Sequence, residues 1–307
     1  MYLNSHTYYS LRYGVFDAQT LVKLAQQNGI NTLALTDINS TSACINFIRE
    51  ARKCGVKPVV GVDVRNGVQQ RFILIAKNND GFQRINQYLT TILLKETELY
   101  TAPELENVWT IYPFVKGETR TLRENEFIGV RPENIPAIRL QKCATDKMVI
   151  LQPVTFQTKK DFNAHRLLRA IDLNTLLSKL PQTEQALPSD QMLPLERLLQ
   201  LFEGYPEIVQ NTKKVLAESS IDFDLSEDRE PQNQKTYTGS EEKDMELLLK
   251  LCREGMKYRY PVASEAIFER VSRELDTIRK MGFVSYFLMN WDIVSYARSQ
   301  GYFYVGR

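Results

Sequence analysis

The sequence predicts an α/β protein, with a barrel-like, mainly parallel sheet wrapped by helices in the first half and a mainly helical region after it. Up to about residue 156, short apolar runs typical of buried strands alternate with amphipathic stretches typical of helices. Beyond residue 161 the strand-like runs stop and helical patterns follow one another. The first half lacks the Gly-rich fingerprint of an open dinucleotide-binding sheet, which favours a closed barrel.

The elements of the first half are marked by turn and cap residues. Asp17 is placed to cap a helix that Gly29 ends, and Ser40 is placed to cap a second helix that Gly55 ends. The expected strands cover 2–5, 32–36, 58–64, 71–77, 109–114, 127–131 and 148–156, and the expected helices cover 17–28, the segment between Ser40 and Gly55, and 81–94.

A polar segment at 226–244 divides the helical half and has the composition of a linker. We therefore expect a barrel with a helical appendage over 1–225, a linker over 226–244, and a further region over 245–307. The helical patterns cover 161–171, 193–204 and 207–219 before this segment, and 245–260, 264–282 and 285–301 after it.

Composition excludes several classes of protein. The 307 residues are 43% hydrophobic and 25% charged, as in a globular protein with a sizeable core. The formal net charge of +2 gives no overall electrostatic signal for nucleic acid. No stretch is long enough to cross a bilayer and the N-terminus lacks a secretory pattern, so we expect a cytoplasmic protein without a membrane partner. The four cysteines form no C-x-x-C pair, and neither a disulfide framework nor a thiolate zinc site is expected.

Polar side chains follow the first three expected strands. Asn4 and His6 lie at the end of the first, Asp37 follows the second, and Asp63 lies near the end of the third. Because the carboxyl ends of barrel strands meet on one face, these side chains should lie close together. One imidazole and two carboxylates could hold a single divalent ion. The alternative is structural: Asp37 caps a turn, Asp63 is a solvated strand end, and His6 is a hydrogen-bonded rim residue.

The shortage of histidine limits this site. The chain has two histidines, and His165, in a helical pattern, is expected to be packed against its neighbours. Multinuclear zinc or manganese sites depend on imidazole ligands. Any metal site here must therefore be rich in carboxylates or sparse.

Several motifs resemble a known family. The segments HTYYSLRYG (6–14), ALTD (34–37) and GVKPVVG (55–61) resemble the opening motifs of the PHP (polymerase and histidinol phosphatase) domain, in the form found at the N-terminus of bacterial DNA polymerase III alpha subunits. IAKNNDG (75–81) and NAHRLLRAI (163–171) are similar to later stretches of those proteins. Residues 274–298 resemble the passage of the alpha subunit into its palm domain, which free-standing PHP phosphatases lack.

The resemblance implies a distorted β/α barrel whose rim, when intact, binds a metal cluster that hydrolyses phosphoesters. Most of the corresponding ligands are replaced here. His6, Asp37 and Asp63 would be the remnant of the metal site, and no catalytic residue is predicted. The positions at which ligands have been lost are Asn4, Ile38, Arg71 and Thr155. A guanidinium cannot ligate a cation, and the resemblance leads us to expect an ion pair between Asp37 and Arg71.

The resemblance also implies a role. The parent would be a DNA-directed DNA polymerase of the polymerase III alpha type, a nucleotidyltransferase in DNA replication or repair synthesis. Its Mg²⁺-binding palm aspartates lie beyond a Gly-Arg-Gly-Ser motif that would begin near Val305-Gly306-Arg307, where this chain stops. We therefore expect a truncated fragment that is inactive by itself, with no cofactor of its own. Its partners would be the rest of the polymerase chain, DNA through the full-length protein, and a proofreading exonuclease subunit.

Three functional hypotheses remain open at this point. The first is a degenerate, metal-free barrel that serves as a structural or docking domain. The second is a PHP phosphoesterase or proofreading 3'-5' exonuclease that uses a reduced Zn²⁺ or Mn²⁺ site of His6, Asp37 and Asp63. The third is a nucleic-acid-binding module that acts through basic residues of the last helices.

Overall fold

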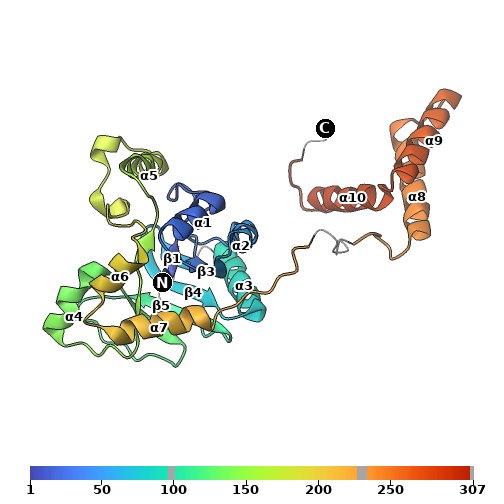
Figure 1. Cartoon of the computed structure of the whole chain (residues 1–307). Helices are drawn as coiled ribbons and strands as arrows, with labels where there is room; N and C mark the ends of the chain where they lie inside the picture. Colours follow the sequence, from blue (N-terminus) through green and yellow to red (C-terminus); the bar gives the residue numbers. More distant parts are fainter. Residues whose placement is uncertain (96–100, 227–233, 305–307) are drawn as a thin grey trace. The chain divides into compact units, whose positions relative to one another are not determined.

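The computed structural model describes residues 1–95, 101–226 and 234–304, which form two compact units, Met1–Leu225 and Ser226–Arg307. The first unit is built around a curled sheet with helices on its outer side (Figure 1). The predicted fold class, a PHP-like distorted β/α barrel followed by helices, is confirmed. In the described part of the chain, no helix has both the length and the apolar character needed to span a bilayer.

The strands of the barrel unit lie close to their expected positions. They are β1 (Asn4–Ser5), β2 (Thr32–Leu35), β3 (Lys57–Asn66), β4 (Gln69–Ala76), β5 (Val108–Pro113), β6 (Glu126–Val130), β7 (Met148–Ile150) and β8 (Pro153–Val154). Six of them form one sheet in the order β2-β3-β4-β5-β6-β7, and β1 pairs in parallel with β8.

Strand β1 closes the barrel between the two ends of this sheet. On one side it pairs with β8, which follows β7 after two residues. On the other side it bonds to β2, where the N–H of Ala34 donates to the carbonyl of Tyr2 at 3.1 Å and the N–H of Thr36 donates to the carbonyl of Ser5 at 3.0 Å. The polar residues that end β1 are therefore held between strands that are about 30 and 150 residues away in sequence.

One strand runs against the others in a set of strand pairings that is mainly parallel, as expected. β4 is antiparallel to both β3 and β5, whereas β2-β3, β5-β6 and β6-β7 are parallel. The cause is a hairpin: Asn66 pairs with Gln69 across a two-residue loop, and Gly67 there has a φ of +58°. As a result the start of β4, rather than its end, lies at the rim of the barrel.

The helices of the barrel unit are α1 (Ala18–Gln27), α2 (Cys44–Lys53), α3 (Asn79–Lys95), α4 (Ile135–Gln141), α5 (Lys159–Asp172), α6 (Leu195–Leu201) and α7 (Pro206–Ala217), with short 3₁₀ turns at Pro132–Asn134, Leu177–Lys179 and Gln182–Glu184. Asp17 caps α1 as expected, since its Oδ1 accepts the N–H of Thr20 at 2.6 Å. Ser40 does not cap α2, which begins only at Cys44 because the chain first makes a tight turn at Asn39 with a φ of +49°. The prediction of that cap was wrong.

Alternate residues of the strands point into the barrel and form its apolar centre. This inner cluster includes Val59 of β3, Ile73 and Ile75 of β4, and Ile111 of β5. The residues that alternate with them along the strands belong to a second cluster, which packs against the helices. The same alternation directs Asp63, four residues after Val59, to the inner side of β3. Helix α7 covers the opposite end of the barrel, where the Nζ of Lys57 donates to its last carbonyls.

The second unit contains α8 (Glu241–Arg259), α9 (Glu265–Lys280) and α10 (Val284–Ser299), which agree with the expected helices. The expected linker over 226–244 was too long, because α8 already begins at Glu241 with Ser240 as its N-cap. Residues 227–233 of that linker, and the predicted motif start at 305–307, lie outside the described residues.

Candidate functional site at the barrel rim

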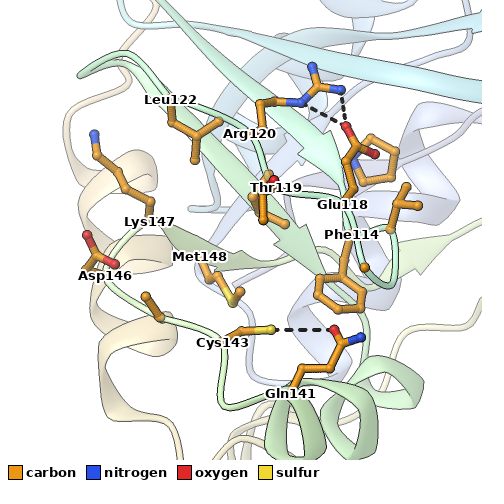
Figure 2. Close-up of a pocket in the computed structure, with 15 residues that line it drawn as sticks. Phe114, Glu118, Thr119, Arg120, Leu122, Gln141, Cys143, Asp146, Lys147 and Met148 are labelled. Atoms are coloured by element: carbon orange, nitrogen blue, oxygen red, sulfur yellow. Dashed lines mark hydrogen bonds and ion pairs between the residues drawn. The ribbon is translucent and has the colours of Figure 1, made fainter.

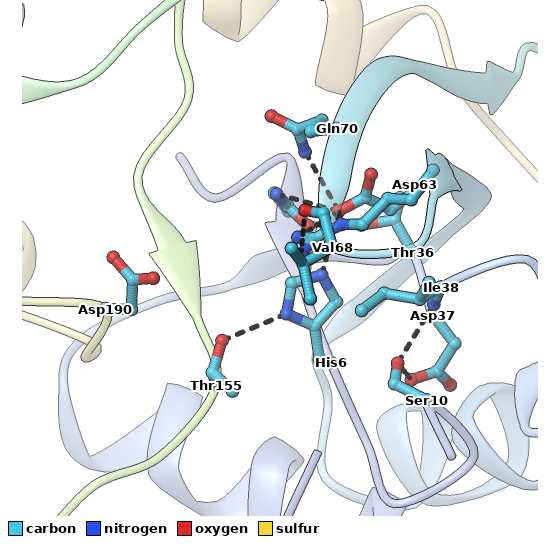
Figure 3. A network of polar contacts seen from close by, with 12 residues as sticks. His6, Ser10, Thr36, Asp37, Ile38, Asp63, Val68, Gln70, Thr155 and Asp190 are labelled. Carbon is cyan, nitrogen blue, oxygen red and sulfur yellow. Dashed lines mark hydrogen bonds and ion pairs between the residues drawn. The ribbon is translucent and has the colours of Figure 1, made fainter. Parts of the chain in front are cut away.

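The rim site lies where β1, β2, β3 and β8 end and β4 begins (Figure 3). Two of the predicted residues are brought together here. The Nε2 of His6 lies 3.1 Å from Oδ2 of Asp63, and its Nδ1 lies 3.0 Å from the hydroxyl of Thr155. Both nitrogens of His6 are thus committed to protein groups. Because the carboxylate can only accept, Nε2 carries the proton that His6 donates to Asp63.

Asp63 is buried and paired with a cation of the protein itself. Its Oδ2 accepts hydrogen bonds from Nε and Nη2 of Arg65 at 3.0 and 2.7 Å, and from the amide of Gln70 at 2.9 Å. Burial by itself would raise the pKa of Asp63, but the charge of Arg65 and the hydrogen bond from His6 outweigh it and hold the pKa well below its usual range. The alternative of a solvated strand end is therefore wrong, since Asp63 is fully buried.

Asp37 belongs to a different set of contacts. Its Oδ1 accepts the N–H of Thr7 and the hydroxyl of Ser10, both at 2.6 Å, and its Oδ2 accepts the hydroxyl of Thr7 at 2.7 Å. Figure 3 shows Asp37 turned toward Ser10, away from Asp63. Burial raises the pKa of Asp37 above its usual value, and these hydrogen bonds act against the rise. Asp37 thus fixes the turn that follows β1.

The contacts of Asp37 do not correspond to the predicted ion pair with Arg71. The N–H of Thr7 and the hydroxyls of Thr7 and Ser10 donate to the oxygens of Asp37, and the guanidinium of the rim site belongs to Arg65. Because β4 is antiparallel to β3, its start lies at the rim, and Gln70, next to Arg71, is the residue of β4 that reaches Asp63.

The positions of the lost ligands are filled by groups that complete the network. The amide of Asn4 lies 3.4 Å from Oδ2 of Asp63, and the hydroxyl of Thr155 contacts His6. Ile38 packs in an apolar cover over the rim. This cover consists of Tyr13, Phe156 and Ala186, with Val15, Ile38, Val68 and Phe162 packed against them.

His165 holds two residues of the cover, Ala186 and Tyr13, by hydrogen bonds. His165 accepts the N–H of Ala186 on Nε2 at 2.9 Å, so its Nδ1 carries the proton that it donates to the carbonyl of Tyr13 at 2.7 Å. Burial lowers the pKa of His165 to about 4. His165 is therefore packed against its neighbours, as expected from the sequence, and it holds the ring of Tyr13 near His6, with centroids 5.6 Å apart.

Arg65, Gln70, Thr7 and Ser10 were missed by the sequence analysis. A signal for Arg65 was present, because residues two apart on a strand share a face and Arg65 follows Asp63 at that spacing. The contacts of Thr7 and Ser10 with Asp37 depend on the pairing of β1 with β2, which no local pattern specifies.

The side chains of the rim do not suit a metal ion. In the described part of the chain, no group of three or more His, Cys, Asp or Glu side chains is placed to hold one. More directly, the guanidinium of Arg65 lies 2.7 Å from the Asp63 carboxylate, which contacts His6, and this puts a fixed positive charge where a cation would bind. We therefore derive no reaction step through a metal at this rim.

A separate hollow of about 680 Å³ lies on the outer side of the unit, between residues 113–122 and 141–148 (Figure 2). Phe114, Leu122 and Met148 line its apolar part, and Glu118 pairs with Arg120 at 2.7 Å on its edge. None of the residues of the rim site lines this hollow, so it is not part of that site.

Comparison with known proteins agrees with this architecture. Residues 3–117 match the model of the PHP domain, and residues 246–307 match the model described as the bacterial DNA polymerase III alpha NTPase domain. The first unit is therefore a barrel of the PHP class. The particular proteins to which the chain is similar, as its motifs predicted, include DNA polymerase III alpha subunits and an error-prone DNA polymerase.

The similarity extends over nearly the whole chain. This chain is 26% identical to the DNA polymerase III subunit alpha of Halalkalibacterium halodurans over 97% of its length, and 26% identical to that of Bacillus subtilis over 98%. It is 25% identical over 100% of the chain to the error-prone DNA polymerase of Symbiobacterium thermophilum. The chain spans about 30% of the length of the first two relatives and 33% of the third.

Proposed function

We propose that this chain is part of a DNA-directed DNA polymerase of the polymerase III alpha type, in which the barrel unit is a metal-free structural or docking domain. The relatives support the polymerase part of the proposal, since they are larger proteins named as polymerases. Replication and error-prone synthesis are both represented among them.

One observation carries the metal-free part of the proposal: the polar groups of the rim are buried, and both nitrogens of His6 and Oδ2 of Asp63 are bonded to neighbouring protein groups. His6 and Asp63 have no exposed surface, and Arg65 is 7% exposed. A catalytic metal needs an open coordination position that substrate or water can reach. Here the carboxylate of Asp63 has no exposed surface, and the guanidinium bound to it lies against the ring of Tyr13.

The partners and cofactors follow from the same proposal. The barrel would contact the rest of the polymerase chain and offer a surface to a proofreading exonuclease subunit, and DNA would be bound by the full-length protein in the cytoplasm. Mg²⁺ would serve the polymerase palm. Zn²⁺ or Mn²⁺ would be relevant only if the rim opened.

The metal-free role is tested by phosphoesterase and nuclease assays of the purified chain with added Mn²⁺ or Zn²⁺. We expect no turnover above that of a heat-denatured sample. Turnover that is lost in Asp63→Asn, but kept in the control variant Glu106→Gln on the surface, would instead establish the reduced-site enzyme. Glu106 makes an exposed ion pair with Arg84 and takes no part in the rim.

The polymerase assignment is tested independently by the reading frame downstream of codon 307. We expect a Gly-Arg-Gly-Ser motif and, beyond it, a pair of aspartates able to hold two Mg²⁺ ions. A frame that continues into an unrelated domain would contradict the assignment without affecting the properties of the rim.

A further inference from the structure

The carboxylate of Asp63 is contacted very unequally on its two oxygens. Oδ2 accepts hydrogen bonds from Nε and Nη2 of Arg65, from the amide of Gln70 and from Nε2 of His6, all within 3.1 Å. Oδ1 is buried and has no hydrogen-bond partner. A buried carboxylate with one unsatisfied oxygen depends on its remaining contacts for compensation of its charge.

Arg65 supplies that compensation from within the same strand. Its guanidinium carbon lies 4.8 Å from the centroid of the Tyr13 ring, so the cation is sandwiched between an aromatic face and the carboxylate. A register shift between Val64 and Arg65 turns the side chain toward Asp63. The amide of Asn39 holds the backbone of Arg65 at this bulge through hydrogen bonds to both its N–H and its carbonyl.

We propose that Arg65 is the resident cation of the barrel mouth, and that the carboxylate of Asp63, held by hydrogen bonds from His6 and Gln70, forms with the ring of Tyr13 a cation site whose occupant is this guanidinium. The site is matched to a planar, weakly hydrated cation with several N–H donors rather than to a metal ion. Removal of the Arg65 side chain therefore leaves a negatively charged cavity that binds free guanidinium. This inference rests on the proposed absence of metal at the rim.

The fold of the barrel unit can be followed by one fluorophore. The chain has two tryptophans, Trp109 in the interior of the barrel and Trp291 on α10 of the other unit. In a Trp291→Phe background, Trp109 alone reports thermal unfolding of the barrel unit. All variants below carry this substitution.

The test is chemical rescue of Arg65→Ala. We expect the variant to unfold roughly 6 °C or more below its parent, because a buried charge has lost its partner. Guanidinium chloride at about 10 mM, too dilute to denature, should raise the midpoint of Arg65→Ala above its value in equimolar NaCl, and should not raise that of the parent. A midpoint within about 1 °C of the parent, or no advantage of guanidinium over sodium, would overturn the inference.

A double-mutant cycle gives a second readout if Arg65→Ala does not fold. Arg65→Met should be less stable than Arg65→Met combined with Asp63→Asn, because the second change removes the orphaned charge. The matched control is Arg84→Met with Glu106→Gln, an exposed pair at 2.6 Å, in which the two changes should be additive. Additive effects at Arg65 and Asp63 would contradict the inference. If both Arg65→Met variants fail to fold, the charge-preserving Arg65→Lys should still fold, and its failure would also contradict the inference.

The two proposals fail in different ways. Stoichiometric metal in the wild-type chain would contradict the metal-free function. If the wild type is free of metal but guanidinium does not raise the unfolding midpoint of Arg65→Ala, only the role assigned to Arg65 is contradicted.

Discussion

Asn39 and Arg65 are joined by two hydrogen bonds from a single side-chain amide. Oδ1 of Asn39 accepts the N–H of Arg65 at 3.0 Å, and Nδ2 donates to the carbonyl of Arg65 at 3.0 Å. Asn39 itself has a φ of +49°, a left-handed conformation that asparagine tolerates better than most residues. The turn after β2 thereby fixes the bulge of β3 that directs Arg65 to Asp63.

Replacement of Asn39 by Asp should weaken this link. The new carboxylate cannot donate to the carbonyl of Arg65, and we expect a loss of about 1–2 kcal/mol in the free energy of unfolding. Denaturant unfolding monitored by Trp109 measures the loss. Asn39→Ala removes the amide and also places alanine at a positive φ, which is strained. Asn174→Ala measures that strain alone, because Asn174 is exposed and has a φ of +48°. Equal losses for the two alanine variants would show that the amide contributes nothing.

Asp37 is predicted to stabilise the turn after β1 rather than to serve catalysis. Asp37→Ala leaves the N–H of Thr7 and the hydroxyls of Thr7 and Ser10 without their acceptor, which should cost about 3 kcal/mol. Ser10→Ala removes one of these links together with the acceptor of the Ile38 N–H, and should cost about 2 kcal/mol. Denaturant unfolding compares the two variants. A loss for Asp37→Ala no larger than that for Ser10→Ala would contradict this role.

His165 should make the barrel unit less stable in mild acid. The pKa of His165 is lowered to about 4 in the folded chain, against an ordinary value of 6.5. Between these values the unfolded chain takes up a proton that the folded chain does not, so stability is full above pH 6.5 and falls as the pH drops toward 4. Protonation would also break the acceptor contact of Nε2 with the N–H of Ala186.

The measurement is the unfolding midpoint of wild type and His165→Asn across this pH range. The other titratable groups are the same in both proteins, so their contributions cancel in the difference. We expect the difference between the two midpoints to change steadily from pH 6.5 to 4. A constant difference would show that His165 does not titrate with a lowered pKa.

The sequence predicted the order of strands and helices better than their directions. Apolar runs and caps such as Asp17 specify local elements, and these lie where expected. The reversal of β4 was signalled by Gly67, which stands at the first position of the two-residue loop Gly67-Val68, but the regular alternation of strands and helices obscured it.

The rim site could be predicted only in part. His6 and Asp63 do meet, because both follow the general rule that strand ends gather on one face. The partners that decide their chemistry could not be read locally: Thr155 lies 149 residues from His6, and it reaches His6 only because β1 pairs with β8. The two-residue spacing places Arg65 on the face of Asp63, but the irregular pairing next to Arg65 could not be read from a pattern of alternating residues.

The account depends most directly on the claim that Asp63 is partnered by Arg65 instead of a metal ion. Titration of the metal-stripped chain with Mn²⁺ and with Zn²⁺, followed by the unfolding midpoint at Trp109 in the Trp291→Phe background, tests it. We predict no rise in the midpoint with either ion, and no fall when a chelator is added to untreated protein. A rise that saturates with added metal and disappears in Asp63→Asn would contradict the account.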